Sequence, residues 1–252
     1  MKKMERHIER LTFVEVKRLI ERGLDSVILP IGTVEAHGPH LPLGTDVMIP
    51  VSIAEKLADE VDSLIAPPVN YGITRSLLVY PGSLTVSSPA FKEYVKGILL
   101  SLSRHGFKKA VVINGHGGQM NELKEVGMEV WSETGLKTVM FNWWIALEQF
   151  TKDFFKQQGG HGAIDETAMI MAIDESLVKK EYYSEESAAV NTLGIDVYPF
   201  QAPIILYKKG EGLPIFDNRK ANEYSKGVIE KTMAMVKDIL AKWDKNQMEF
   251  EK

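Results

Sequence analysis

Short apolar runs alternate with longer stretches of helical periodicity along most of this chain. Residues 26–31 (SVILPI) and 110–113 (AVVI) are continuous apolar runs, and residues 63–66 and 137–141 are further strand candidates. Runs of this length that are bounded by turn residues indicate strands buried on both faces. Because such strands alternate with helices, the pattern predicts an α/β fold whose central sheet is mostly parallel.

Two helix starts are marked by local signals. Thr12 and Glu15 form a capping-box pattern, and Ser88 followed by Pro89 is typical of an N-cap and the first helical residue. The apolar spacing then predicts helices over residues 12–23, 47–61, 88–106, 120–133, 161–172 and 227–242.

The remaining long segment, residues 181–220, is irregular and polar, with strand character only at residues 203–207. No repeat, low-complexity stretch or change of composition marks a linker. The simplest interpretation is therefore that residues 1–252 form one domain, a size that can bury a substantial core.

Composition narrows the function classes. The chain has 30 basic and 34 acidic side chains and a net charge of −4, so it lacks the basic surplus that general nucleic-acid binding requires. It has no cysteine, so any metal must be bound by nitrogen and oxygen ligands. Residues 1–10 do not resemble a secretory signal, and no apolar run approaches the ~20 residues that span a bilayer. We therefore expect a cytoplasmic protein without a membrane partner.

Metal-binding side chains concentrate in two loops that follow predicted strands. Residues 32–46 include Glu35, His37 and Asp46, and residues 114–118 (NGHGG) include His116. In open α/β sheets, ligands bind beyond the carboxyl ends of the strands, where these loops are expected. Glu35 and His37 alternate, so they point the same way in an extended segment. This set predicts a site for two divalent ions about 3.5–4 Å apart, either Zn, Mn or Fe(II).

Simpler interpretations fit single members of this set. Asp46 by itself fits the N-cap of the following helix, and His40, in the same loop, would pack against the neighbouring prolines. Gly117 and Gly118 let the backbone turn sharply beside a bound substrate, but they also fit a plain strand-to-helix turn.

A third segment, residues 159–167, adds His161 and Glu166 at a helix start. Their spacing of five lets both face the same cleft. Glu166 is a candidate metal ligand or general base, and His161 is a candidate to move protons or to polarise a substrate carbonyl. A solvated helix-capping cluster is the alternative.

Aromatic and basic residues supply candidate substrate contacts. Trp143 and Trp144 follow the strand at 137–141 and would stack on a flat heterocycle, although packing in the core or at a subunit interface fits them equally well. Tyr71, Arg75 and Ser76 are candidates for binding a phosphate, but a single Arg more often forms a surface ion pair.

Three blocks of the sequence resemble the signature of the creatininase (creatinine amidohydrolase) family. They are residues 29–46 (LPIGTVEAHGPHLPLGTD), 114–118 (NGHGG) and 161–167 (HGAIDET), and the likeness in order and spacing covers roughly residues 10–180. The resemblance implies a three-layer α/β/α sandwich, a homo-oligomer and a catalytic His161. It matches four residues to metal ligands, with Asp46 bridging the ions: Glu35, His37, Asp46 and His116.

The chain departs from true creatininases at two positions. Gly118 stands where they place a metal-binding Glu, and Gln157 stands where they place a substrate-stacking Trp. The Gly-Gly form resembles the branch that includes archaeal formamide deformylases, which remove formate from a formylamino-pyrimidine ribonucleotide. By this resemblance, Glu166 is expected to complete the second metal site.

The sequence therefore predicts a metal-dependent amidohydrolase that acts on a C–N amide bond of a small molecule, most simply a formamide. Paired ions would lower the pKa of a water molecule, and the resulting nucleophile would attack the amide carbonyl. Creatinine or another cyclic amide is the alternative substrate. A non-catalytic protein that binds metal or nucleotide at the same loops, or an assembly subunit, is the alternative from another class.

Overall fold

The computed structural model describes residues 4–192 and 194–246, and four parallel strands form its central sheet. Their order is β2–β1–β3–β4, and Ser26 of β1 is opposite both Ser63 of β2 and Lys109 of β3. All four carboxyl ends therefore lie at one edge of the sheet, as the sequence predicted. The strands span Ser26–Ile31 (β1), Ser63–Ile65 (β2), Lys109–Asn114 (β3) and Lys137–Asn142 (β4).

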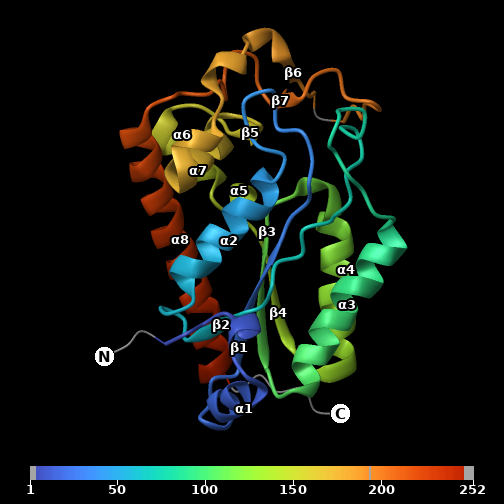
Figure 1. The fold of residues 1–252 in the computed structure, drawn as a ribbon, viewed down its shortest axis with the longest axis vertical. Helices are drawn as coiled ribbons and strands as arrows, with labels where there is room; N and C mark the ends of the chain where they lie inside the picture. The colour runs from blue at the N-terminus through green and yellow to red at the C-terminus, as the bar shows by residue number, and fades with distance from the viewer. Residues whose placement is uncertain (1–3, 193, 247–252) are drawn as a thin grey trace.

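Helices cover both faces of this sheet, which confirms the three-layer α/β/α arrangement (Figure 1). One face carries α2 (Thr45–Leu57), α7 (Ile164–Asp174) and α8 (Asn218–Lys245). The other face carries α3 (Ser88–Arg104) and α4 (Met120–Thr134).

Short elements complete the fold. The helix α1 (Phe13–Glu21) lies at the end of the sheet where β1 begins, and α5 (Trp143–Ala146) and α6 (Glu148–Phe155) follow β4 (Figure 1). Single 3-10 turns occupy Ile8–Arg10, Gly117–Gln119, Glu175–Leu177, Lys180–Tyr182 and Glu185–Ser187.

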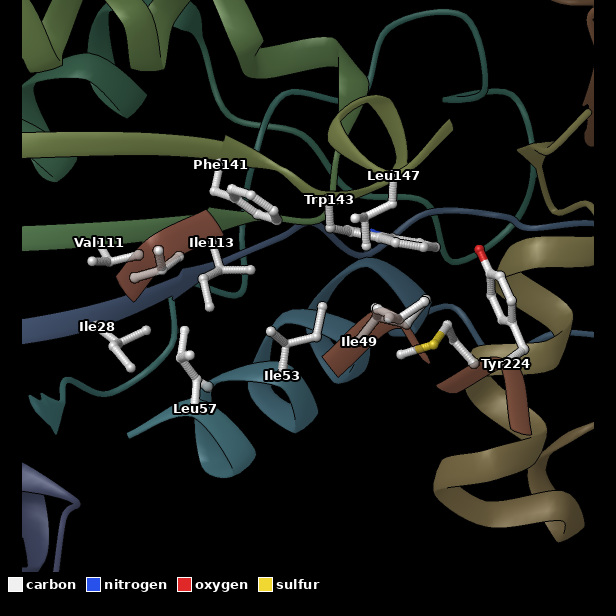
Figure 2. Packing of buried hydrophobic residues seen from close by; sticks show 14 of the residues in the cluster. Ile28, Ile49, Ile53, Leu57, Val111, Ile113, Phe141, Trp143, Leu147 and Tyr224 are labelled. Carbon is white, nitrogen blue, oxygen red and sulfur yellow. The ribbon is translucent and has the colours of Figure 1, made fainter. Parts of the chain in front are cut away.

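Side chains of β1 alternate between two hydrophobic cores. Ile28 faces the α2, α7 and α8 layer, whereas Val27 and Leu29 face the α3 and α4 layer, and all three are fully buried. Figure 2 shows Ile28 and its strand neighbours packed against one side of α2. Because both faces of the sheet are covered, an uninterrupted apolar run at 26–31 is what the strand requires.

A second, small sheet lies above the carboxyl edge of the main sheet, in the order β5–β7–β6 (Figure 1). Its strands are β5 (Gly160–His161), β6 (Ala188–Val190) and β7 (Ile204–Leu206), so strand structure occurs within the segment predicted at 203–207. This sheet brings His161 over the loop that follows β1. None of the helices in the described residues is long and apolar enough to cross a bilayer.

Several helix boundaries differ from the sequence pattern. α2 begins at Thr45 rather than Val47, so Asp46 lies in its first turn, and Gly44 is the N-cap. The N-cap of α3 is Ser87, whose hydroxyl accepts from the Ala90 amide, one residue before the predicted cap. α8 begins at Asn218, nine residues earlier than expected, because Asp217 caps a polar first turn that carries no apolar periodicity.

Candidate metal centre and substrate pocket

Five side chains from four separate segments meet at the carboxyl edge of the sheet. Glu35 and His37 lie on the loop after β1, Asp46 in the first turn of α2, His116 after β3 and Glu166 in the first turn of α7. Each is at most 7% exposed. The structure therefore brings together all five residues that the sequence marked as metal ligands.

Asp46 lies at the centre of this cluster. Its Oδ1 is 2.8 Å from Nε2 of His37, and its Oδ2 is 2.9 Å from Nδ1 of His116. Its side chain does not cap α2, so the simpler N-cap interpretation does not describe it. The two oxygens of one carboxylate thus face two histidines from different loops.

The cluster divides into two triads that share Asp46. One consists of Glu35, Asp46 and His116, the other of His37, Asp46 and Glu166, and the ligand atoms within each triad lie within 4.8 Å of one another. Such a shared carboxylate is the arrangement expected for a site that holds two neighbouring cations.

Main-chain carbonyls fix the orientation of the three histidine rings. The ring N–H at Nδ1 of His37 donates to Glu35 O at 2.9 Å, and that at Nε2 of His116 donates to Ile73 O at 2.9 Å. Nε2 of His161 donates to Ala36 O at 2.7 Å. Because a carbonyl oxygen only accepts, the other nitrogen of each neutral ring is left with its lone pair toward the cluster. Metal-ligating histidines typically have this second hydrogen bond.

The donor set fits divalent cations. Oδ2 of Asp46 is buried and makes no aligned hydrogen bond, although Nδ1 of His116 is close to it. A buried carboxylate oxygen without a proton donor is costly unless a cation is near. Carboxylate oxygens together with imidazole nitrogens suit Zn, Mn and Fe(II).

Electrostatics show how strongly this cluster attracts positive charge. Burial alone would lower the pKa of His37, but the carboxylates of Asp46 and Glu166 raise it to about 10. Burial would lower the pKa of His116 too, yet the carboxylates of Glu35 and Asp46 hold it well above the ordinary value. Burial raises the pKa of Glu166 well above its usual range, and the neighbouring carboxylate of Asp46 adds to this. In the metal-free protein, protons on the histidines would supply the positive charge that cations otherwise provide.

His161 differs from these two histidines. Burial and the positive charge of His37 lower its pKa to about 4, so its ring is neutral near pH 7. Its ring centre lies 4.1 Å from that of His37, and its Nδ1 lies 3.7 Å from Oε1 of Glu35. A neutral ring beside the cluster suits proton transfer, and the same position would also allow metal ligation, since Glu35, His37 and His161 form a third group of possible ligands.

A cavity of about 210 Å³ opens onto this cluster. Gly117, Gly118 and Trp144 line it, together with His161 and Glu166, so these predicted contacts are accessible to a small molecule. The other residues on its wall include Arg75, Ser76, Leu77, Tyr198, Ile205 and Tyr207.

Trp143 does not contact this cavity. Its side chain is 0% exposed and packs in the core with α2, α7 and α8 (Figure 2). The prediction of a substrate contact is therefore wrong for Trp143 and remains a prediction for Trp144. The two adjacent side chains at the start of α5 differ in their surroundings: Trp143 lies wholly in the core, whereas Trp144 packs against the edge of that core and also lines the cavity.

The two departures from true creatininases have local structural causes. A Cβ on Gly118 would lie 2.4 Å from Nε2 of His116 and 2.5 Å from Ile73 O, so a side chain there would break the bond that orients His116. Gln157 does not line the cavity, and its Oε1 accepts a hydrogen bond from the Gly212 amide at 3.0 Å.

Several contributors carry no signal in the sequence. The carbonyls of Ala36 and Ile73 orient His161 and His116, but any residue type supplies a carbonyl. Tyr198 and Tyr207 come from the polar segment 181–220, which contains no motif. Only their place just after β7 and in the loop before it, beside His161 of β5, reveals them.

His40 lies outside the cluster despite its place in the same loop. Its Nε2 is 2.9 Å from Oγ1 of Thr167, and its ring packs between Tyr183 and Phe216. The sequence analysis expected packing against prolines and did not identify Thr167, Tyr183 or Phe216 as its partners. Tyr71 is 59% exposed and does not line the cavity.

Curated relatives include enzymes with different substrates. The creatinine amidohydrolase of Pseudomonas putida is 23% identical over 194 residues, which cover 68% of this chain and 73% of that protein. A 3-dehydro-scyllo-inosose hydrolase of Thermotoga maritima is 29% identical over 112 residues, 44% of this chain and 36% of that protein. A mycofactocin precursor peptide peptidase of Mycolicibacterium smegmatis is 33% identical over 115 residues, 42% and 45% of the two chains. The matches therefore span less than half the length of the last two relatives.

Solved creatininase structures share the fold of this chain. A variant described as the Zn–Zn type superposes with a TM-score of 0.80 and 20% identity, covering 94% of this chain and 98% of that one. A Mn form gives a TM-score of 0.77 and 21% identity, covering 95% and 98%. The family model described as creatininase, creatinine amidohydrolase, matches residues 9–227. Because this match includes most of the chain, the protein belongs to the creatininase (creatinine amidohydrolase) family.

Proposed function

We propose that the protein is a metal-dependent amidohydrolase that cuts the C–N bond of a small amide, with a formamide of the formylamino-pyrimidine type as the favoured substrate. The observation that carries this proposal is the sharing of Asp46 by two triads of buried ligands. Membership of a hydrolase family and the cavity that reaches these ligands support it.

The residues present fit two cations. Glu35, Asp46 and His116 would hold one, and His37, Asp46 and Glu166 would hold the other. When bound, such ions polarise a carbonyl and lower the pKa of water. The solved creatininases described as the Zn–Zn type and the Mn form support divalent ions of this type. Gly118 offers no ligand, so the carboxylate of Glu166 would complete the second triad.

His161 is the group best placed to move a proton in this site. Its Nε2–H is held by Ala36 O, which leaves Nδ1 as the free base beside Glu35. In the metal-free protein, burial and the positive charge of His37 lower its pKa, so the ring is neutral near pH 7 and keeps a lone pair at Nδ1. Addition of water across the amide yields a carboxylic acid and an amine, and the leaving nitrogen needs one proton.

The cavity favours a small planar substrate. Its volume of about 210 Å³ suits one ring rather than a peptide, and Trp144 and Tyr207 supply aromatic faces. The positions where true creatininases place a metal-binding Glu and a stacking Trp hold Gly118 and Gln157, which argues against creatinine. A formamide needs little space at the reacting carbon, because its carbonyl carbon carries only a hydrogen atom besides the nitrogen.

The open cavity also argues for an enzyme over a non-catalytic metal protein. Structural metal sites are usually closed by protein ligands, whereas catalytic sites keep a position open to solvent or substrate. Here Glu35, Asp46, His116 and Glu166 all line the cavity.

Metal analysis combined with a substrate screen tests the proposal. Purified protein is loaded with Zn, Mn or Fe(II), and formate release is measured with formylamino-pyrimidines and simple aromatic formamides, alongside creatinine and a dipeptide. We expect formate from the formamides and none after chelation. Full activity in metal-stripped protein, or release from creatinine alone, would overturn the proposal.

A further inference from the structure

One permanent cation lies on the wall of the cavity, away from the candidate metal ligands. Among the residues that line the cavity, Arg75 is the one Lys or Arg. Its side chain is 47% exposed, so the guanidinium is partly open to solvent. The floor of the same cavity carries the carboxylates of Glu35, Asp46 and Glu166, which the cations of the proposed function would neutralise.

Arg75 is held rigidly by two acceptors behind it. Its Nε donates to Gly118 O at 3.1 Å, and its Nη2 donates to Oε1 of Glu122 at 2.8 Å. The hydroxyl of Ser88 also donates to Oε1 of Glu122, at 2.9 Å. Nη1 of Arg75 has no partner among the described residues. The guanidinium is thus fixed along one edge and keeps donors on the other.

Gly118 makes this placement possible. The segment that leads to Arg75 packs directly on Gly118, since a Cβ there would lie 2.5 Å from Ile73 O. A glutamate at position 118 would have no room beside this segment. Glycine at position 118 therefore leaves this part of the wall without a negative charge, and the segment that packs on it carries the positive charge of Arg75.

We propose that the substrate of this enzyme carries an oxyanion group, a carboxylate or a phosphate, which Arg75 binds at the rim of the cavity. The inference rests on the proposed function, because it assumes that the amide end of the substrate lies at the triads. An arginine fork that is held along one edge presents its remaining N–H groups in the geometry that oxyanions accept. Arg75 then determines specificity: it selects anionic amides over neutral ones of the same shape.

A purely structural interpretation of Arg75 makes a different prediction. Glu122 is 7% exposed, and an arginine that only neutralised it would not affect which amides bind. Loss of the arginine alone would leave this buried carboxylate without its partner and destabilise the fold. The test therefore uses the double variant Arg75→Met/Glu122→Gln, which removes both charges together. Arg104→Met, an exposed arginine at the end of α3, is the matched control.

The experiment compares three probes of similar shape: formanilide, 4-formamidobenzoate and 4-formamidophenyl phosphate. Calorimetry measures their binding to the metal-loaded protein, and formate release is recorded in parallel. We expect at least one anionic probe to bind about tenfold or more tightly than formanilide, and the better anion identifies the group. The preference should fall to near one in the double variant, be weakened in Arg75→Lys and persist in Arg104→Met.

Two results would overturn the inference. One is equal binding of neutral and anionic probes to the wild-type protein. The other is an anion preference that persists in the double variant, which would place the anion on the metals instead. Absence of formate from all probes would count against the proposed hydrolysis, but the binding ratios would still decide the part played by Arg75.

Discussion

The two ends of the central sheet differ in how deeply they bury charged side chains. Near α1, a groove of about 1000 Å³ is lined by side chains of both signs, and Arg6 forms ion pairs of 2.8 Å with Asp59 and Asp62. At the carboxyl edge, a cavity of about 210 Å³ gathers carboxylates that are almost fully buried, with Asp46 2% exposed.

The comparison shows that neither the volume of a cavity nor the number of charged side chains that line it identifies a binding site. In the α1 groove, Asp62 is 73% exposed, so water screens its pair with Arg6 and the pair contributes little. At the carboxyl edge, loops and the small β5–β7–β6 sheet exclude water from like charges. Such a cluster is stable only if protons or cations balance it.

The largest expected effect comes from Asp46→Asn. This change removes one of the two carboxylate charges in each triad, so we expect loss of bound metal. Activity should fall by at least about 100-fold, because loss of a group that only hydrogen-bonds a metal ligand can already cost about that much. Metal content per chain and formate release are the measurements. Asp62→Asn at the α1 end should change stability by less than about 1 kcal/mol and leave metal content intact. Retained metal in Asp46→Asn would break the contrast between the two ends.

Two adjacent tryptophans allow the core and the cavity to be tested separately. Trp143→Ala removes a fully buried ring, so we expect the free energy of unfolding to fall by about 3–5 kcal/mol. Trp144→Ala should cost less stability, because Trp144 is only partly buried at the edge of the core, and should raise KM, because Trp144 lines the cavity. Denaturant unfolding and steady-state kinetics distinguish the two. If both variants lost stability equally, Trp144 would belong to the core.

A pair of adjacent glycines tests how tightly the site is packed. Gly118→Ala would push a methyl group against His116 and Ile73 O, and we expect a loss of about 1–3 kcal/mol together with lower metal content. Gly117→Ala is the control, because the nearest atom to its Cβ is a carbon of Trp144 at 3.7 Å. Thermal unfolding with metal analysis decides. An unchanged Gly118→Ala protein would show that the segment at Ile73 moves freely.

The stability of the metal-free protein should depend on pH more strongly than that of the metal-loaded protein. The pKa of His37 is raised from 6.5 to about 10, so its proton stabilises the fold fully below pH 6.5. That contribution is lost as the pH rises through about 10. We expect chelated protein to lose stability between pH 7 and 9, whereas metal-loaded protein, in which a cation replaces the proton, should lose less. Parallel profiles for both forms would contradict this account.

The candidate site divides into residues that sequence alone could identify and residues that it could not. Glu35, His37, Asp46 and His116 stand in Gly- and Pro-rich loops after strands, and such loops have few structural uses for so many ionisable side chains. Trp143 and Trp144 have the same type and neighbouring positions, and only the direction of each side chain at α5 separates core from cavity.

Secondary structure divides in the same way. The strands at 26–31 and 109–114 were predicted to within a residue, because burial on both faces demands an uninterrupted apolar run. The start of α8 was missed by nine residues, since its first turns are polar and depend on the cap from Asp217. The short strands β5 and β6 were also missed, because pairing with β7 alone holds them.

By itself, the sequence determined the parallel α/β architecture and identified the candidate ligands, since hydrophobic periodicity and ligand chemistry are local properties of the chain. Only the tertiary structure decided that Asp46 joins two triads, that His116 is oriented by a carbonyl at Ile73, and that Arg75 stands on the cavity wall. These contacts connect segments 43 to 120 positions apart (Ile73 to His116, and Asp46 to Glu166). Their distances are fixed by the packing of strands and helices, which no local pattern records.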